Sequence, residues 1–204
     1  MVKEIRVYIE GGGDTKNTKP LFKEGFRSFL DDLFQIARER RIKCNLIVCG
    51  RRNAAYRDFR NALADHPDAY NILLVDSEGP VTQKPWQHLR SRDNWDSLGT
   101  EDDQCHLMVQ AMEAWFMADI ETLSRFYGQG FQANSLPRNS NIEDIPKDRL
   151  EPSLKAATRP TQKGEYQKIK HGCELLKQID VLTVRGASEH CDRLFQKIEE
   201  ILKS

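Results

Sequence analysis

Two short apolar runs in this chain each end at a carboxylate. The first run, residues 5–9, leads into Glu10, and the second, residues 71–75, leads into Asp76. Both contain the β-branched residues that favour strands. In an open α/β sheet, ligands bind just beyond the carboxyl ends of the strands. Two such ends side by side would place Glu10, Asp76 and the nearby Glu78 around one point.

Three carboxylates around one point repel one another unless a cation holds them. Hard oxygen ligands with room for water favour Mg²⁺ or Mn²⁺. The alternative is a tight turn after Glu10 and a strand end after Asp76, both with solvated carboxylates. Alternate residues of an extended segment share a face, so Asp76 and Glu78 can point the same way. This spacing favours metal binding.

The order of the predicted elements places these strand ends in one sheet. Strand and helix alternate as far as residue 75, which implies right-handed crossovers and flanking helices. The predicted fold class is therefore α/β, with a Rossmann-like, mostly parallel central sheet. The elements expected here are a strand at 3–10, a helix at 18–40, a strand at 43–49, a helix from Asn53 to His66, and a strand at 71–75.

The rest of the chain is expected to form one further strand and several helices. Residues 79–104 are polar and are expected to form a long loop near the site, because loops of this length are often functional. The remaining expected elements are a strand at 107–110, a helix at 111–127, an irregular stretch at 129–149, a short helix with Pro152 in its first turn through Ala157, a helix at 171–179, a weak strand or turn at 181–184, and a final amphipathic helix that carries Leu194 to Leu202.

The charge balance excludes a global basic field. The 204 residues contain 31 Lys and Arg against 31 Asp and Glu, so any nucleic-acid contact must use a local patch or a partner's charge. We expect one domain over residues 1–204, with a core over about 1–127 and a C-terminal helical extension over about 128–204.

No apolar run approaches the roughly 18 residues of a membrane span. The charged N-terminus does not resemble a signal peptide, so a cytoplasmic location without membrane contact is expected.

The cysteines indicate a reduced protein. There are five, an odd number, and no Cys-x-x-Cys, which fits free thiols better than a disulfide framework. Cys44 and Cys49 are an odd number of residues apart on a predicted strand and should face opposite sides. The Cys-His neighbours at 105–106 and 190–191 are weak zinc candidates, because adjacent residues rarely reach one ion and further ligands are missing.

The strand ends also carry a resemblance to a known fold. A Glu and a glycine turn after the first strand, then an Asp-x-Asp-like pair after a later strand, resemble the Toprim domain of topoisomerases, bacterial primases and ATPase-linked nucleases. More closely, the chain resembles a Toprim-like bacterial family, domain of unknown function family 4276. In place of the usual Asp-x-Asp pair, this chain has Asp76-Ser77-Glu78. The resemblance covers nearly the whole chain and rests on residues 10–14, 75–79, 112–119 and 163–170.

This resemblance implies a Toprim-like fold and a set of metal ligands. The set is Glu10, Asp76 and Glu78, with Glu113 as a further ligand and Mg²⁺ or Mn²⁺ as the cofactor. From the sequence alone, Glu113 can equally be a solvent-facing residue, or a carboxylate that the dipole of its helix stabilises in the first turn.

A glycine turn and two aspartates have both functional and structural interpretations. Gly11, Gly12 and Gly13 would let backbone N–H groups approach a phosphate at the start of the next helix. The chain lacks the rest of a GxGxxG fingerprint or a Walker A loop, so a plain tight turn is the alternative. Asp14 is either a further ligand or an N-cap, and Asp119 is expected to begin or cap a helix.

A basic cluster surrounds Tyr166. Lys163, Lys168 and Lys170 are candidates for positioning phosphate, and Tyr166 is a candidate for stacking on a base. Lys168 or Lys163 would also offset negative charge on the reacting phosphate. The alternative is a solvated helix edge or loop.

Two hypotheses of different class follow. The first is a metal-dependent phosphodiesterase, hence a nuclease acting on DNA or RNA, with Glu10, Asp76, Glu78 and Lys168 as catalytic residues. A carboxylate that is not bound to the metal would take the proton of the attacking water, and Glu10 is the candidate. The second is a non-catalytic nucleotide-binding or docking subunit of an ATPase complex.

The resemblance implies an ATPase partner, in systems that defend bacteria against phage. A topoisomerase is disfavoured because the chain is too short to carry a separate domain with a nucleophilic tyrosine. Primase activity rests on fold analogy alone. Homo-oligomerisation stays open.

Overall fold

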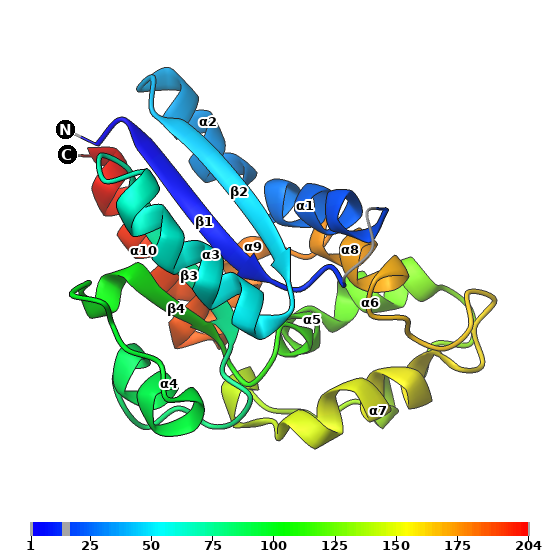
Figure 1. Cartoon of the computed structure of the whole chain (residues 1–204). Coiled ribbons are helices and arrows are strands. Elements are labelled where there is room, and N and C mark those ends of the chain that lie inside the picture. Colours follow the sequence, from blue (N-terminus) through cyan, green and yellow to red (C-terminus); the bar gives the residue numbers. More distant parts are fainter. Residues whose placement is uncertain (1, 14–16, 204) are drawn as a thin grey trace.

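Four parallel strands form the central sheet, in the order β2-β1-β3-β4. The computed structural model describes residues 2–13 and 17–203. Every neighbouring pair of strands is parallel, so their carboxyl ends meet at one edge of the sheet (Figure 1). The structure confirms the predicted α/β class and is consistent with a Rossmann-like or Toprim-like fold. The strands are β1 (Glu4–Glu10), β2 (Lys43–Gly50), β3 (Tyr70–Asp76) and β4 (Cys105–Met108).

Ten α-helices are assigned in the part of the chain that the structure describes. Short 3₁₀ turns precede β4 and interrupt the segment between α6 and α7. The α-helices are α1 (Thr18–Phe29), α2 (Asp31–Glu39), α3 (Arg52–Asp65), α4 (Pro85–Asp93), α5 (Glu113–Ala118), α6 (Ile120–Tyr127), α7 (Lys147–Thr158), α8 (Lys170–Leu176), α9 (Val181–Ala187) and α10 (Glu189–Lys203).

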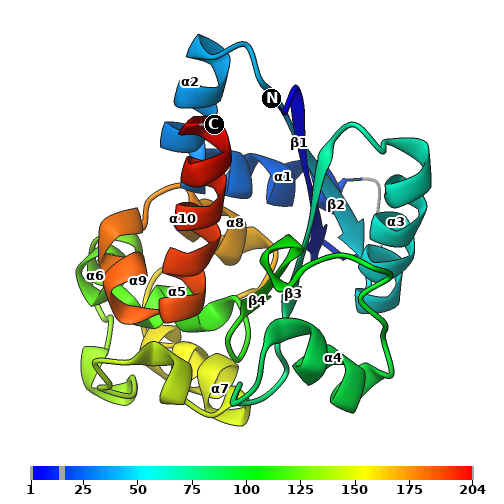
Figure 2. The same cartoon turned by 90° about the vertical axis from the view of Figure 1, so that its left-hand side faces the viewer.

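Successive side chains of the strands pack alternately in two apolar clusters, one on each face of the sheet. Val7 and Ile9 pack in the cluster that α1, α2 and α10 cover. Tyr8, between them, packs with Phe59 of α3 and Trp86 of α4 on the other face. Figure 2 shows α10 and α3 on opposite sides of the sheet. This arrangement follows from the period of two in a strand, which sends successive side chains to opposite faces.

The C-terminal helices share the core of the sheet. Leu150, Leu175 and Phe195 belong to the same buried cluster as Ile5 on β1. In Figure 1, α5, α6 and α7 lie beyond the carboxyl ends of the strands. Of these helices, α7 belongs to the expected C-terminal extension and α5 and α6 belong to the expected core, so both parts of the chain lie at the edge of the sheet where ligands bind in open α/β folds.

Two predicted long helices are each broken in two. The helix expected at 18–40 is interrupted at Leu30, which ends α1 and lets both α1 and α2 turn their apolar faces into one cluster. The helix expected at 111–127 is interrupted at Asp119, whose side chain accepts a hydrogen bond from the Thr122 backbone N–H. Asp119 therefore caps α6, as the sequence predicted.

Three further elements differ from the sequence-based expectation. The loop expected at 79–104 contains α4, which begins at Pro85, a residue whose fixed φ suits a first turn. Pro152 lies inside α7 rather than in its first turn, and it is exposed, so water can satisfy the carbonyl it leaves free. The β-branched stretch after Asp180 forms α9, because the Asp180 carboxylate caps it by accepting from two backbone N–H groups. Capping there outweighs the strand propensity of the stretch.

The cysteine expectations agree with the structure. All five cysteines are free. Cys44 packs against one apolar cluster and Cys49 lies in the other, so the two face opposite sides of β2. Within residues 2–13 and 17–203, no helix has both the length and the apolar character required to cross a membrane.

His106 on β4 makes the stability of the fold dependent on pH. The side chain is buried, and its Nε2 lies 3.0 Å from the Asp103 carbonyl oxygen. Burial lowers the pKa of His106 from 6.5 to about 3. The folded state therefore keeps His106 neutral, whereas the unfolded state takes up a proton below pH 6.5, so stability falls as the pH falls through that range.

Protonation of His106 in the unfolded state is expected to lower the free energy of unfolding by about 2 kcal/mol between pH 7 and pH 5. His106→Gln keeps a donor for the Asp103 carbonyl but does not titrate, so its stability should fall less over the same range. Urea unfolding of both proteins at each pH measures the difference. Equal pH dependence in the two proteins would contradict the assignment.

Candidate metal centre

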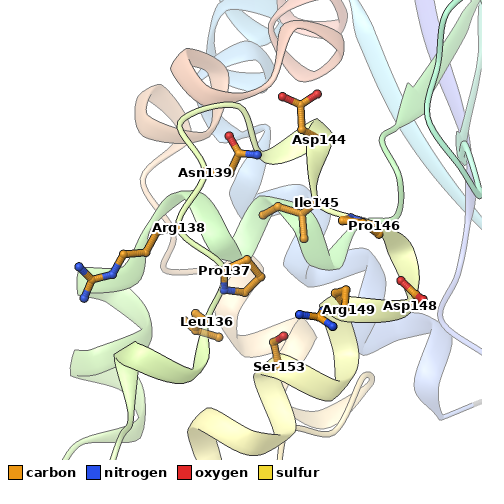
Figure 3. A pocket seen from close by; sticks show the side chains of 10 residues that line it. All are labelled: Leu136, Pro137, Arg138, Asn139, Asp144, Ile145, Pro146, Asp148, Arg149 and Ser153. Carbon is orange, nitrogen blue, oxygen red and sulfur yellow. The ribbon is translucent and has the colours of Figure 1, made fainter.

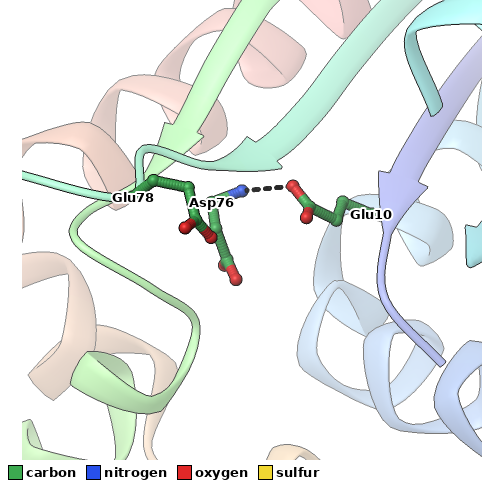
Figure 4. A group of neighbouring side chains, drawn as sticks. All are labelled: Glu10, Asp76 and Glu78. Carbon is green, nitrogen blue, oxygen red and sulfur yellow. Dashed lines mark hydrogen bonds between the residues drawn. The ribbon is translucent and has the colours of Figure 1, made fainter. Parts of the chain in front are cut away.

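Three carboxylates meet at the carboxyl ends of β1 and β3. Glu10 is the last residue of β1, Asp76 is the last residue of β3, and Glu78 follows two residues later. β1 and β3 are hydrogen-bonded parallel neighbours, which brings the two ends together. One oxygen atom of each carboxylate lies within 4.8 Å of the other two. Figure 4 shows the side chains pointing toward a common space.

The donor set and its spacing fit a hard divalent cation. All three groups offer oxygen atoms, which Mg²⁺ and Mn²⁺ prefer. In octahedral coordination of Mg²⁺, with bonds of about 2.1 Å, adjacent oxygens are about 3 Å apart and opposite oxygens about 4.2 Å apart. The carboxylate oxygens, separated by up to 4.8 Å, would therefore have to draw together by side-chain rotation to bind one ion. Among the described residues, this is the one group of three His, Cys, Asp or Glu side chains close enough for a metal.

Glu10 is held in place by Arg52, the first residue of α3. The Arg52 Nη1 donates to Glu10 Oε2 at 3.0 Å and also to the Asp76 carbonyl oxygen. The Asp76 backbone N–H donates to the same Glu10 oxygen at 3.1 Å. Burial raises the pKa of Glu10, and the charge of Arg52 opposes that shift. These contacts fix one carboxylate oxygen of Glu10 and orient the other toward the cluster.

Asp76 is the most buried of the three carboxylates. Its Oδ1 accepts a hydrogen bond from the Met112 backbone N–H at 2.9 Å, and its Oδ2 lies 4.0 Å from the Lys168 ammonium. Burial raises the pKa of Asp76 to about 7, and the nearby charges of Glu10 and Glu113 act in the same direction. An ionised Asp76 is therefore unfavourable unless more positive charge is close to it.

Glu78 has an uncommon backbone conformation and two cationic partners. Its φ is 67°, in the left-handed region that side chains other than glycine rarely adopt. Its backbone N–H donates to the Gln110 carbonyl at 2.9 Å. The Lys147 ammonium contacts Oε1, and the Arg92 guanidinium lies 3.3 Å from Oε2. The turn thus directs the side chain toward the cluster, between two cations.

Glu113 lies beside the cluster, outside its three members. It begins α5 and is 3% exposed. The Tyr166 hydroxyl donates to its Oε1 at 3.2 Å, and the Lys168 ammonium lies 3.1 Å from the same oxygen. Lys168 thereby bridges Glu113 and Asp76. The structure places Glu113 as an anchor for Lys168, and its role as a metal ligand stays a prediction.

The comparisons with known proteins identify the family. A model of the family described as a domain of unknown function (DUF4276) matches residues 9–199. The chain belongs to this family. The match includes every carboxylate of the cluster and also Glu113 and Lys168. Searches of curated proteins and of solved structures found no match.

The glycine turn of this DUF4276 chain has a clear packing role. Gly11, Gly12 and Gly13 all have positive φ, at 127°, 80° and 66°. A Cβ on Gly11 would lie 2.5 Å from the Phe22 ring, and one on Gly12 would lie 2.7 Å from Val48. The Gly11 N–H donates to the Gly50 carbonyl, so it is not available to a phosphate. Phosphate binding by Gly12 and Gly13 stays a prediction.

Asp14, which the sequence offers as a ligand or an N-cap, lies outside the residues that the structure describes. Helix α1 begins after Asn17, whose side chain makes no capping hydrogen bond.

Only one of the three candidate lysines contacts the carboxylates. Lys168 does so through Glu113 and Asp76, whereas the Lys163 ammonium lies 4.7 Å from the centre of the Phe126 ring. Lys170 is exposed and lines a surface groove of about 510 Å³ together with Lys168 and Leu21 of α1. Phosphate binding by Lys163 and Lys170 stays a prediction.

Tyr166 cannot stack on a base. It is 1% exposed, packs beside Phe116 and donates to Glu113, so the sequence-based expectation for it is wrong. Gly172 allows this burial, because a Cβ there would lie 3.0 Å from the Tyr166 hydroxyl.

Sequence reasoning missed the cations that surround the DUF4276 cluster. Arg52, Arg92 and Lys147 come from α3, α4 and α7, and each contacts a carboxylate of the cluster. Arg52 could have been found from the sequence, because it lies two residues after the carboxyl end of β2. Arg92 and Lys147 could not, because their proximity depends on how α4 and α7 pack over the edge of the sheet.

A separate pocket lies against the first turn of α7. It has a volume of about 590 Å³ and is lined by apolar residues such as Leu136 and Ile145, with Asp148 and Arg149 of α7 at its side (Figure 3). None of its lining residues belongs to the carboxylate cluster.

Proposed function

We propose that this chain is a metal-dependent phosphodiesterase of the Toprim type that cleaves nucleic acid. The observation that carries the proposal is the cluster of Glu10, Asp76 and Glu78 at the carboxyl ends of two neighbouring parallel strands. The glutamate after the first strand and the Asp-x-Glu pair after a later strand match the order of the Toprim pattern. Fold similarity alone would not support an activity, so the argument rests on the site.

The residues of the cluster have distinct roles in this proposal. A bound Mg²⁺ or Mn²⁺ would polarise the phosphoryl oxygens, activate a water and stabilise the leaving oxygen. Asp76 and Glu78 would hold the cation, and Glu10, as the carboxylate not bound to it, would accept the proton of the attacking water. Arg52 and the Asp76 N–H fix one oxygen of Glu10 and leave the other for that proton. Lys168, 4.0 Å from Asp76, offsets charge on the phosphate.

The family resemblance supports a setting for this activity. We propose that the chain acts with an ATPase partner in defence against phage. The formal net charge of zero fits this setting, because a partner can supply the basic surface that binds nucleic acid. The second candidate function is a non-catalytic nucleotide-binding or docking subunit of the same complex, which the same net charge favours.

A cleavage assay tests the proposal. We expect the purified chain to cut labelled DNA or RNA in Mn²⁺ or Mg²⁺, and we expect EDTA to abolish cleavage and added Mn²⁺ to restore it. Both nucleic acids are offered, single- and double-stranded, and the ends of the products are analysed. Cleavage that survives EDTA would contradict the metal centre.

The double variant Glu10→Ala, Asp76→Ala is the control for a contaminating nuclease. It should be inactive under every condition in which the wild type cuts. No cleavage by the wild type, even with excess protein and Mn²⁺, would favour the docking subunit.

A further inference from the structure

Glu78 is held between two cations from different helices. The Lys147 ammonium, from the first residue of α7, contacts Oε1, and the Arg92 guanidinium, near the end of α4, lies 3.3 Å from Oε2. Arg92 also pairs with Asp93, so its charge is shared. Among the described residues, Glu78 is the acidic partner of the Lys147 ammonium. Lys147 is therefore the main cationic partner of Glu78.

The buried side chain and backbone of Gln110 hold Glu78 and Lys147 in position for this ion pair. The Gln110 carbonyl accepts from the Glu78 N–H at 2.9 Å, and its side-chain oxygen accepts from the Lys147 N–H, also at 2.9 Å. The Gln110 amide nitrogen donates to the Glu143 carbonyl at 3.3 Å. Gln110 is 6% exposed. One residue thus fixes the backbone on both sides of the ion pair, which distinguishes it from a chance contact between two surface side chains.

The contact places Lys147 in competition with a divalent cation. An oxygen of Glu78 that accepts a hydrogen bond from an ammonium cannot at the same time turn freely toward a metal ion. Lys147 is 37% exposed and has a flexible four-carbon stem, so its ammonium can leave Glu78 while α7 stays in place. A lysine freed beside a metal centre lies where the phosphate of a substrate would bind, and an ammonium is a good point charge for a phosphate oxygen.

The geometry points to Lys147 as a tethered counter-ion that a divalent cation displaces from Glu78 and that then binds a phosphate group of the substrate. This inference rests on the proposed function, because it needs a cation at the cluster and a phosphate beside it. It assigns a substrate-positioning role to a residue at the start of α7. It also gives α7, which lies beyond the carboxyl ends of the strands, a role in binding the substrate.

Calorimetric titration of the chain with Mn²⁺, without nucleic acid, tests whether the cation displaces Lys147 from Glu78. Lys147→Ala removes the competing ammonium, so we expect it to bind Mn²⁺ about fivefold more tightly than the wild type. Lys155→Ala is the matched control, because Lys155 lies two turns along α7 and pairs with Glu151. It should bind Mn²⁺ like the wild type. Unchanged or weaker Mn²⁺ binding by Lys147→Ala would overturn the inference.

Fluorescence anisotropy of labelled DNA and RNA oligonucleotides in Ca²⁺ tests whether Lys147 binds a phosphate group of the substrate. Lys147→Ala should bind the oligonucleotide that the wild type prefers several-fold more weakly, and Lys155→Ala should not. Tighter Mn²⁺ binding with unchanged oligonucleotide binding would overturn the phosphate role. Lys147→Met, which keeps the aliphatic stem, repeats both measurements if Lys147→Ala proves unstable.

A separate variant isolates failure of the proposed function itself. Asp76→Asn should bind Mn²⁺ much more weakly than the wild type. If it binds Mn²⁺ equally well, the metal centre is wrong, whatever Lys147→Ala does. If it binds weakly and Lys147→Ala shows no gain in Mn²⁺ affinity, only the role of Lys147 is wrong.

Discussion

Asp76→Asn is expected to lower metal-dependent cleavage by about 10³-fold or more, which corresponds to about 4 kcal/mol of transition-state stabilisation. Asp76 is the central member of the carboxylate cluster, since its backbone N–H also fixes Glu10. Asparagine has almost the same shape as aspartate and still accepts a hydrogen bond from the Met112 N–H. The substitution therefore removes one negative charge and one metal-binding oxygen with little change in packing.

The same variant should not lose stability. The pKa of Asp76 is raised from 3.8 to about 7, mainly by burial and then by the charges of Glu10 and Glu113. A carboxyl group whose pKa is raised by folding destabilises the folded state as the pH rises from its ordinary pKa toward the raised one. Asparagine carries no such charge. In EDTA at pH 7, thermal unfolding should therefore show a Tm for Asp76→Asn at least as high as for the wild type.

Asp68→Asn is the matched control for this measurement. Asp68 is exposed and precedes β3, at the end of the strand away from the cluster. It should keep both wild-type cleavage and wild-type Tm. Cleavage by Asp76→Asn at the wild-type rate would show that the reaction does not use the cluster. A large fall in its Tm would show that Asp76 has mainly a structural role.

The strands β1, β2 and β3 were predictable because each is a short run of strand-forming residues with clear ends, whereas β4 (Cys105–Met108) lies two residues before the expected 107–110, since apolar residues continue past its end. The runs at residues 5–9 and 71–75 form β1 and β3 within one or two residues of the expected bounds. The break at Leu30 was not predictable, because the apolar spacing continues across it and the two short helices turn there to pack on one core. At Asp119 the apolar spacing also continues, and only the capping carboxylate indicated where a helix begins. The α9 helix was missed because a single cap, Asp180, outweighs the β-branched residues that follow it.

In the candidate site, too, the features that depend on local sequence were predictable and those that depend on tertiary packing were not. The proximity of Glu10, Asp76 and Glu78 followed from the rule that parallel strands end at one edge. The partners of these carboxylates did not follow, because Lys147 is 69 residues from Glu78 along the chain and meets it only through tertiary packing. The burial of Tyr166 was missed for a similar reason, since the polar residues around it in sequence gave no sign of an apolar pocket.

Arg52 connects the cluster to the helical layer on one face of the sheet. Besides Glu10 and the Asp76 carbonyl, its guanidinium donates to both oxygens of Asp93 on α4, at 3.0 and 2.6 Å. It also lies 4.9 Å from the centre of the Trp95 ring. The side chains of Arg52, Glu10 and Asp93 are each no more than 15% exposed. Removing Arg52 would leave two largely buried carboxylates without their main cation.

Arg52→Leu is therefore expected to lower the free energy of unfolding by about 3 kcal/mol, because breaking a buried ion pair from one side leaves the other charge uncompensated. Urea unfolding at pH 7 in EDTA measures it. Arg57→Leu is the matched control, since Arg57 lies on the same helix, is exposed and pairs with its neighbour Asp58. It should change stability by no more than about 0.5 kcal/mol. Equal unfolding midpoints for the two variants would contradict the network.

Arg52→Lys separates the charge of Arg52 from its shape. Lysine keeps the positive charge but cannot donate to Glu10, the Asp76 carbonyl and both oxygens of Asp93 at once. We expect it to recover part of the lost stability. Its cleavage should still be about 10- to 100-fold below the wild type, because Glu10 is no longer held in one orientation. Wild-type cleavage by Arg52→Lys would show that charge alone is sufficient at this position and that the orientation of Glu10 by the guanidinium does not matter.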